Sequence, residues 1–333
     1  MSEREDIWVV STSPHAHSGD SVRKIMLAVI VALLPALAAA LWLFCWDTVR
    51  LVSACVASCV VAEAVSRKLM RRDTGIADLS AVVTGLLLAF NLPPSLPLWM
   101  AVLGSVFAIV IAKQVFGGIG YNPFNPALAG RVFLFFCFPA AMTTWHAPGA
   151  GCSADAVTAA TPLGMWKTAW SNGAAPSGFF ELFPLRNLFL GAQAGCIGEV
   201  SAFALLLGGA YLLWRRCIYW QTPMFYLGTV AAFSGLLWLL DPARNLSPLY
   251  HLLSGGLMLG AFFMATDMVT SPVTKRGMAV FGVGCGLLTV VIRKWGGPPE
   301  GVSFSILLMN AVTPLINRCT KSRVFGHKKE GGA

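Results

Sequence analysis

A Thr-Pro pair in a polar stretch is the first group of residues that could support chemistry. The stretch reads Asp-Ala-Val-Thr-Ala-Ala-Thr-Pro-Leu over 155–163, and its two hydroxyls belong to Thr158 and Thr161. Thr followed by Pro is typical of a helix start, where the Thr hydroxyl caps the first backbone N–H groups and Pro takes the first helical position. A helix N-terminus also carries unpaired N–H groups and a partial positive charge, which suit a phosphate. The pair therefore predicts either a plain helix cap or a site that holds a phosphate.

Acidic and amide residues also lie at the ends of apolar segments. Asp267 ends one such segment and is followed by Thr270, while Asn122 and Asn125 each precede a proline. A carboxylate inside a membrane is costly and indicates a functional site, but at a helix end it can be a solvated cap. The amides have a similar alternative, because Asn before Pro often closes a turn with its own side chain. These residues predict a second ligand site or a cation path, with caps and turns as the alternative.

Four further charged residues could either bind a ligand or face solvent. Glu63 and Glu199 could each bind a proton or Na⁺, but we expect them to be helix-end residues that face water. Lys167 and Arg186 follow the Thr-Pro pair and could neutralise a phosphate. Long basic side chains near a membrane more often extend to its interface, and this is the expected role of both.

The composition places all these groups in a membrane protein. Of 333 residues, 56% are hydrophobic and 12% are charged, and the mean hydropathy is +0.69. Soluble domains carry about 25% charged residues, so a soluble enzyme is excluded. The net charge of +9 does not indicate nucleic-acid binding, because the basic residues cluster between apolar segments as in oriented membrane proteins. The nine cysteines form no CxxC pair and show no zinc or iron–sulfur spacing, so we expect no metal site.

Ten apolar segments predict an all-α polytopic membrane protein, since a helical span needs roughly 20 apolar residues. They lie at approximately 25–46, 50–66, 77–92, 97–116, 131–145, 196–214, 222–240, 249–268, 278–293 and 302–317. Basic residues favour the connections on the N-terminal side, which include Arg67, Lys113, Arg131 and Arg215, with Arg293 as an exception on the other side. This distribution predicts that both termini are cytoplasmic.

The only long polar connection, 146–195, divides the ten segments into two sets of five. Because five is odd, the second set is expected to be inverted relative to the first, and inverted repeats build sites from broken helices. The predicted parts are a cytoplasmic N-terminal arm, a first membrane repeat, an extracytoplasmic loop, a second membrane repeat and a basic cytoplasmic tail. Their ranges are 1–24, 25–145, 146–195, 196–317 and 318–333.

Several long segments resemble the NqrB/RnfD family. The string Asp-x-x-Thr-x-Ala-Thr at 155–161 resembles the motif on which a flavin transferase places FMN, although Ala159 stands where many members have Gly. Similarity to family motifs covers nearly the whole chain, in segments 13–27, 78–99, 113–136, 262–277 and 300–316. NqrB proteins have a longer N-terminal region, so this shorter chain is most similar to the Rnf-type members.

The resemblance implies an electron-transfer subunit in the bacterial inner membrane, inactive alone. Rnf-type complexes pass electrons between ferredoxin and NAD and couple this transfer to Na⁺ or H⁺ translocation. The implied partners are an extracytoplasmic FMN subunit, two small membrane iron–sulfur subunits, cytoplasmic NAD- and ferredoxin-facing subunits, and the flavin transferase.

The resemblance also implies the cofactors. FMN is expected as a phosphoester on Thr161, on the extracytoplasmic side, with Asp155 and Thr158 as acceptor-motif residues. It also allows a second, non-covalent flavin, riboflavin, near Asn122, Asn125, Asp267 and Thr270. Without the resemblance, inverted five-helix repeats would favour a stand-alone channel or secondary transporter. An NqrB-type quinone-reductase subunit is a further alternative.

Overall fold

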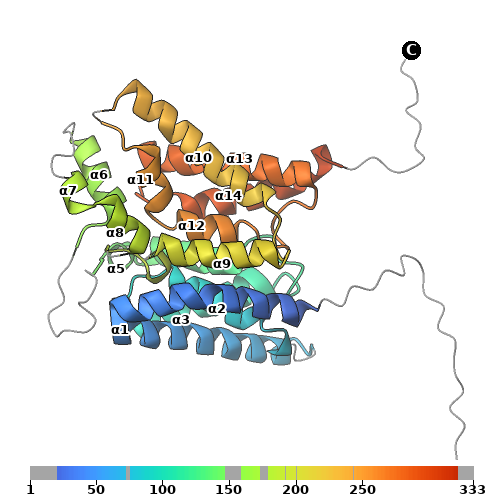
Figure 1. Cartoon of the computed structure of the whole chain (residues 1–333). Helices are drawn as coiled ribbons and strands as arrows, with labels where there is room; N and C mark the ends of the chain where they lie inside the picture. Colours follow the sequence, from blue (N-terminus) through green and yellow to red (C-terminus); the bar gives the residue numbers. More distant parts are fainter. Residues whose placement is uncertain are drawn as a thin grey trace, which may run out of the picture.

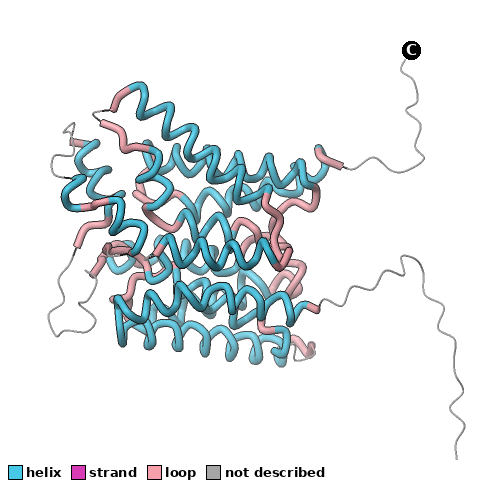
Figure 2. Tube along the Cα trace, in the orientation of Figure 1, coloured by secondary structure: helices cyan, strands magenta, loops and turns pink. Residues whose placement is uncertain are grey.

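The computed structural model describes residues 21–72, 76–146, 159–172, 179–191, 193–199, 201–242 and 244–321. Within these ranges the chain forms helices and loops but no strand (Figures 1 and 2). Four of the described helices are long and apolar enough to cross a membrane: α1 (Val22–Leu69), α10 (Gln221–Leu240), α13 (Lys275–Trp295) and α14 (Val302–Cys319). The prediction of an all-α polytopic membrane protein is confirmed, while the division into two inverted repeats stays a prediction.

Helix α1 contains two of the predicted segments, 25–46 and 50–66. Its first turn is capped by Ser21, whose hydroxyl accepts a hydrogen bond from the backbone N–H of Lys24. Its helical geometry is interrupted at Cys45, where φ is 46°. Just beyond, the hydroxyl of Thr48 donates to the backbone carbonyl of Ala40 at 3.1 Å. The chain therefore turns back at this point, and Figure 1 shows the two halves of α1 running in opposite directions.

Other predicted segments form shorter or interrupted helices. Three are too short to span a bilayer, which takes roughly 20 residues: α2 (Ser80–Phe90), α4 (Pro126–Cys137) and α9 (Ala202–Trp214). Two others contain π-helical turns, which often mark functional sites. They are α3 (Leu98–Val106) with η2 (Phe107–Gln114), and α11 (Pro248–Leu253) and α12 (Leu257–Leu259) with η5 (Gly260–Met264).

Short helices complete the described chain. They are η1 (Ile76–Asp78), α5 (Pro139–Met142), α6 (Pro162–Ser171), α7 (Phe179–Leu182), α8 (Leu185–Leu190) and η4 (Ile197–Glu199). Figure 1 shows α6, α7 and α8 at one end of the bundle, whereas α1 begins and α14 finishes at the opposite end.

A large core joins the helices that precede α6, α7 and α8 in the chain to the helices that follow them. Leu33 of α1, Phe90 of α2, Leu128 of α4, Phe263 of η5 and Phe281 of α13 all belong to it and are buried. Helix α2 is apolar and buried on nearly all sides, as expected of a helix surrounded by protein. The two parts of the chain therefore form one packed body.

Three basic residues that we counted as loop charges are buried inside helices, so that part of the charge count was wrong. Lys113 lies in η2, Arg131 in α4 and Arg293 in α13, with exposures of 3%, 8% and 0%. Arg293 donates to the backbone carbonyls of His251 and Ser254 at 2.6 and 3.0 Å. A buried charge needs such partners, and each of these residues therefore takes part in internal structure rather than in membrane orientation.

Candidate functional site

Thr161 begins α6, as its sequence context predicts. Its hydroxyl oxygen accepts a hydrogen bond from the backbone N–H of Gly164 at 3.1 Å, and Pro162 occupies the first helical turn. The side chain is buried, with 6% of the residue exposed. The predicted helix cap is therefore confirmed, and it stands at the N-terminus of a ten-residue helix.

Two side chains fasten α6 to later segments of the chain. The indole N–H of Trp166 donates to the backbone carbonyl of Arg244 at 3.0 Å. The ammonium of Lys167 donates to the backbone carbonyl of Pro298 at 3.0 Å and also to that of Gly296. Helix α6 is thus held against the loop between α10 and α11 and against the loop between α13 and α14.

A cavity of about 510 Å³, here called the Thr161 cavity, opens beside this helix cap. Its volume falls within the range of about 300–1,000 Å³ that is usual for small-molecule sites. Its lining combines aromatic surface with charged groups: Arg131, Phe135, Trp145, Thr161, Lys167, Glu300 and Phe304. Arg131 is paired with Glu300, so Lys167 is the cation there without a carboxylate partner among the described residues. Partial burial lowers the pKa of the Lys167 ammonium from its usual value. An aromatic ring system that carries a phosphate fits this lining, because the walls are apolar and Lys167 supplies a counter-charge.

The floor of the Thr161 cavity is a buried polar cluster around Arg131. One guanidinium nitrogen, Nη1, donates to the side chains of Asn91 and Ser303, both at 2.9 Å. The other, Nη2, pairs with the carboxylate of Glu300 and lies 4.0 Å from that of Glu199. Glu199 is only 6% exposed, so the expectation that it faces water was wrong.

Sequence reasoning missed Arg131, Glu300 and Cys196 as members of this cluster. The sulfur of Cys196 accepts a hydrogen bond from Arg131 at 3.6 Å, and together with Glu199 and Glu300 it forms a compact set of potential ligand atoms. Arg131 could have been found from the sequence, because charged residues are rare in apolar helices and indicate a functional position. Nothing in the local sequence marks Cys196.

A second cavity, here called the Asp267 cavity, gathers residues predicted from distant parts of the sequence. It measures about 120 Å³ and is lined by polar side chains that include Lys113, Asn122, Asn125 and Asp267. Thr270 lies outside the lining but donates its hydroxyl to the Asp267 carboxylate at 3.1 Å. Residues of α1 near its start also line this cavity, which places it at the end of the bundle opposite α6.

The amides of the Asp267 cavity also have the local roles that we considered as alternatives. Asn122 donates to the backbone carbonyl of Phe124 at 3.0 Å and so closes a turn. Asn125 caps α4 by accepting from the N–H of Ala127 at 3.1 Å, and it donates to the carbonyl of Met264 at 3.3 Å. The cavity is smaller than the usual range for organic ligands, and the riboflavin site stays a prediction.

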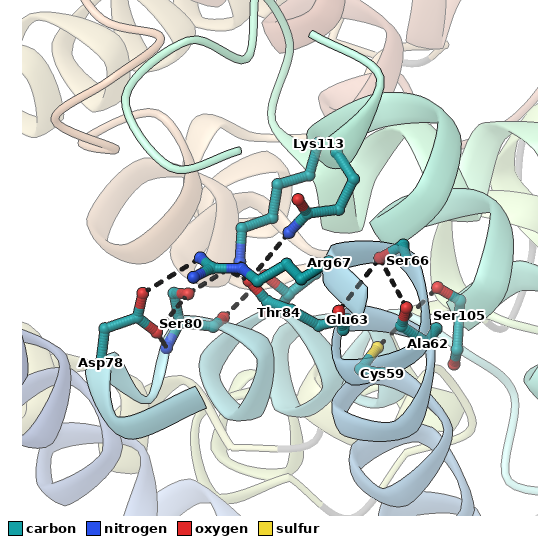
Figure 3. A network of polar contacts seen from close by, with 11 residues as sticks. Cys59, Ala62, Glu63, Ser66, Arg67, Asp78, Ser80, Thr84, Ser105 and Lys113 are labelled. Carbon is teal, nitrogen blue, oxygen red and sulfur yellow. Dashed lines mark hydrogen bonds and ion pairs between the residues drawn. The ribbon is translucent and has the colours of Figure 1, made fainter. Parts of the chain in front are cut away.

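Glu63 lies in a buried ion-pair network beside the Asp267 cavity (Figure 3). Its carboxylate accepts from Lys113 at 2.9 Å, from Gln114 at 2.9 Å and from Arg67 at 3.0 Å. Lys113 also donates to the hydroxyl of Ser80 at 2.7 Å. Glu63 has no exposed surface, so the expectation that it faces water was wrong. The network ties the second half of α1 to α2 and η2.

Three predicted residues stand apart from these sites. Asp155 and Thr158 fall outside the described residues. Arg186 is exposed on α8 and does not line the Thr161 cavity, whereas Lys167 does. Of the two basic residues considered as phosphate partners, only Lys167 lies where it could act as one.

Comparison with known proteins covers nearly the whole chain. Residues 9–326 match the model of the "NQR2, RnfD, RnfE family". The chain is 50% identical over 323 residues to the D subunit of the Na(+)-translocating ferredoxin:NAD(+) oxidoreductase complex of Acetobacterium woodii, and the match covers 96% of each protein. It is 39% identical over 354 residues to the D subunit of the ion-translocating oxidoreductase complex of Salmonella newport and of Salmonella agona, covering 97% of this chain and 99% of each relative.

Proposed function

Because this chain belongs to the NQR2, RnfD, RnfE family, we propose that it is the D-type membrane subunit of an Rnf-type complex. The relatives named above are subunits of ion-translocating oxidoreductase complexes, and they align with this chain end to end. The proposed activity is electron transfer through the membrane part of a complex that passes electrons between ferredoxin and NAD. This transfer is coupled to the translocation of Na⁺ or H⁺ across the membrane. Alone, the chain has no partner to supply or remove electrons and is therefore inactive.

We propose further that Thr161 carries FMN as a phosphoester. The observation that carries this proposal is the position of the Thr161 side chain in the wall of a 510 Å³ cavity that also contains Lys167. The cavity has aromatic walls for a ring system and a cation for a phosphate, and a helix N-terminus adds further positive potential. Bound FMN would supply two-electron chemistry that can be divided into single-electron steps.

The protein's own contribution is to hold and orient the flavin. The contacts of Trp166 and Lys167 with the carbonyls of residues 244, 296 and 298 fix α6, and with it the attachment point. Arg131 is held by Asn91 and Ser303 at the floor of the same cavity. These contacts hold the cavity walls and Thr161 in one arrangement, as electron transfer to neighbouring carriers requires.

The proposed partners follow from this role. Electrons would be exchanged with an extracytoplasmic FMN subunit and with two small membrane subunits that hold an iron–sulfur cluster, while other subunits face NAD and ferredoxin in the cytoplasm. The proposed orientation in the inner membrane has both termini in the cytoplasm and α6 on the outer side.

Flavin fluorescence in a denaturing gel tests the cofactor. We expect fluorescence from the chain when it is produced with an active flavin transferase, and none when the transferase is omitted or Thr161 is replaced by Ala. Fluorescence that survives Thr161→Ala would move the tether to another residue. A chain that never becomes fluorescent beside an active transferase would favour a stand-alone transporter.

Labelling with a membrane-impermeant thiol reagent tests the orientation in intact cells. Ser171 at the end of α6 and Lys275 at the start of α13 are both exposed. We expect Ser171→Cys to be labelled from outside and Lys275→Cys only after the cells are opened. The unsubstituted chain measures the background from its own cysteines, and the reverse pattern would contradict the proposed orientation.

A further inference from the structure

Two buried oxygen atoms beneath Thr161 accept no hydrogen bond within the described chain. They are Oε1 of Glu199 and Oε1 of Gln193, in residues that are 6% and 5% exposed. A buried acceptor without a donor is costly, and native structures rarely leave one unsatisfied. Both atoms therefore indicate that a donor not supplied by these side chains belongs here.

A small cavity lies between these residues and the residue that begins α6. It measures about 10 Å³ and is lined by residues that include Thr161, Gln193, Glu199, Gly255 and Glu300. This is about the space that one water molecule needs. Both residues with unsatisfied oxygens line this small cavity, and it shares Thr161 and Glu300 with the lining of the Thr161 cavity.

The charges around Glu199 leave it without a full counter-charge. Among the described residues, the guanidinium in contact is that of Arg131 on α4, which pairs closely with Glu300 and lies 4.0 Å from Glu199. Arg293 on α13 is another buried cation nearby, but its two terminal nitrogens donate to the carbonyls of His251 and Ser254, while its Nε has no partner within the described residues. Two ionised carboxylates would therefore share one arginine in a buried place, which favours a neutral form of one of them.

The neighbours of Glu199 favour a proton over a metal ion as the ligand. Hard cations such as Na⁺ prefer a shell of oxygen ligands, whereas one side of Glu199 is taken by the sulfur of Cys196 and another by the guanidinium of Arg131. A proton needs only the carboxylate oxygen itself. Since Glu300 is the better-paired carboxylate, Glu199 is the one that takes the proton.

We propose that Glu199 is a proton-binding residue whose protonation follows the charge held in the Thr161 cavity. The proton site itself stands on the geometry above, while its response to redox state rests on the proposed function. If a flavin held at Thr161 accepted one electron from a one-electron carrier of a neighbouring subunit, one negative charge would be added to the cavity, and a proton from water would form an O–H bond at Glu199. When the electron leaves to the next carrier, that bond breaks and the proton returns to water.

Infrared difference spectroscopy on the purified native complex tests this proposal. Protonated carboxylic acids have a C=O stretching band that ionised carboxylates lack. We expect such a band to titrate with pH in the wild type, and its midpoint to lie higher in the reduced than in the oxidised complex. A shift on the order of one pH unit is expected for one charge added in the neighbouring cavity at an effective dielectric constant near 20.

Matched variants assign the band. Glu199→Gln should abolish it, while Glu181→Gln, which changes an exposed carboxylate on α7, should leave it unchanged. Glu300→Gln should lower the midpoint, because Arg131 then pairs with Glu199 alone. A band that persists in Glu199→Gln would overturn the proposal. So would a wild-type complex with no titrating acid band, a result that does not depend on whether the variants fold.

Two further outcomes separate this proposal from the function it accompanies. In the Thr161→Ala complex the band should still titrate with pH but should no longer respond to reduction. If the wild type carries no flavin while the Glu199 band titrates, the proposed function fails and the proton site stands.

The effect of Na⁺ tests which ligand the site binds. If Na⁺ at constant pH removes the band, the site binds a metal cation, and the proton proposal is wrong.

Discussion

The hydroxyl oxygen of Thr161 and the backbone N–H of Gly164 are joined by a hydrogen bond of 3.1 Å. The residue proposed to carry FMN is therefore also the residue that begins α6. Esterification would replace the hydroxyl hydrogen with phosphorus but leave the oxygen in place. Capping and attachment consequently use the same atom, and substitutions can separate the two roles.

Substitution of Thr161 by Asp should keep the helix cap and lose the flavin. Asp is as good a cap as Thr, whereas Ala costs about 1 kcal/mol at such a position. We expect Thr161→Asp to match the wild type in thermal stability without flavin, Thr161→Ala to be less stable and unmodified, and Thr161→Ser to retain both properties. Gel fluorescence and thermal unfolding in detergent measure the two effects. Fluorescence in Thr161→Asp would show that the tether lies elsewhere.

Attachment of FMN should make Lys167 less reactive toward acylating reagents. Burial lowers the pKa of Lys167, so more of the reactive neutral amine is present at a given pH. A phosphate nearby acts in the opposite direction, because it raises the pKa and occupies the ammonium. We expect severalfold slower labelling of Lys167 in the flavin-loaded chain than in Thr161→Ala, as measured by peptide mass spectrometry. Exposed Lys275 should react equally in both, and equal rates at Lys167 would argue against a phosphate contact.

Removal of Lys113 should destabilise the chain far more than removal of an exposed basic residue. Lys113→Met leaves the buried carboxylate of Glu63 with fewer partners, and breaking a buried pair costs on the order of 3 kcal/mol. Arg50→Met breaks the ion pair with Asp47, in which the arginine side chain is 48% exposed, and should cost about 0.5 kcal/mol or less. Chemical unfolding in detergent measures both. Equal effects would mean that the Glu63 network adds little to stability.

Substitution of Gly255 by Ala should loosen the contact between α6 and the break after α11. Gly255 has φ +70°, and a Cβ there would lie 2.9 Å from Leu163 and 3.1 Å from Arg293. The left-handed conformation alone costs a residue with a side chain about 1–2 kcal/mol. We expect Gly255→Ala to lower the Tm by several degrees. Gly297→Ala is the control, because a Cβ at that position meets no atom within 4 Å. A Tm equal to that of the control would contradict the expected strain.

Local signals explain what could be predicted from the sequence. The helix start at Thr161 depends only on neighbouring residues, so its pattern was sufficient. The apolar segments also reappear as helices, because a run of apolar residues is a local signal. Their lengths were less predictable, since α2, α4 and α9 are too short to span a bilayer by themselves. Asp267 and Asn125 were predicted to contribute to one ligand site, and they do line one cavity.

Two of the buried charge pairs could not be predicted, because their partners are distant in sequence, unlike Glu63 and Arg67, which are four positions apart. Glu63 and Lys113 are 50 positions apart, and Arg131 and Glu300 are 169 apart. A lone acidic residue near a helix end has no local feature that distinguishes a solvated cap from an ion pair. That distinction depends on which helices pack together, and the order of the segments alone does not fix this packing.

The fastening of α6 at Trp166 and Lys167 has a consequence for the electron path. A chromophore attached at Thr161 would be held by a helix that is fixed to the rest of the protein, rather than by a mobile segment. Its distance to the next carrier would then stay the same from one turnover to the next. Shuttling between partners would have to come from movement of those partners, and the emission of the attached dye should remain strongly polarised in the folded protein.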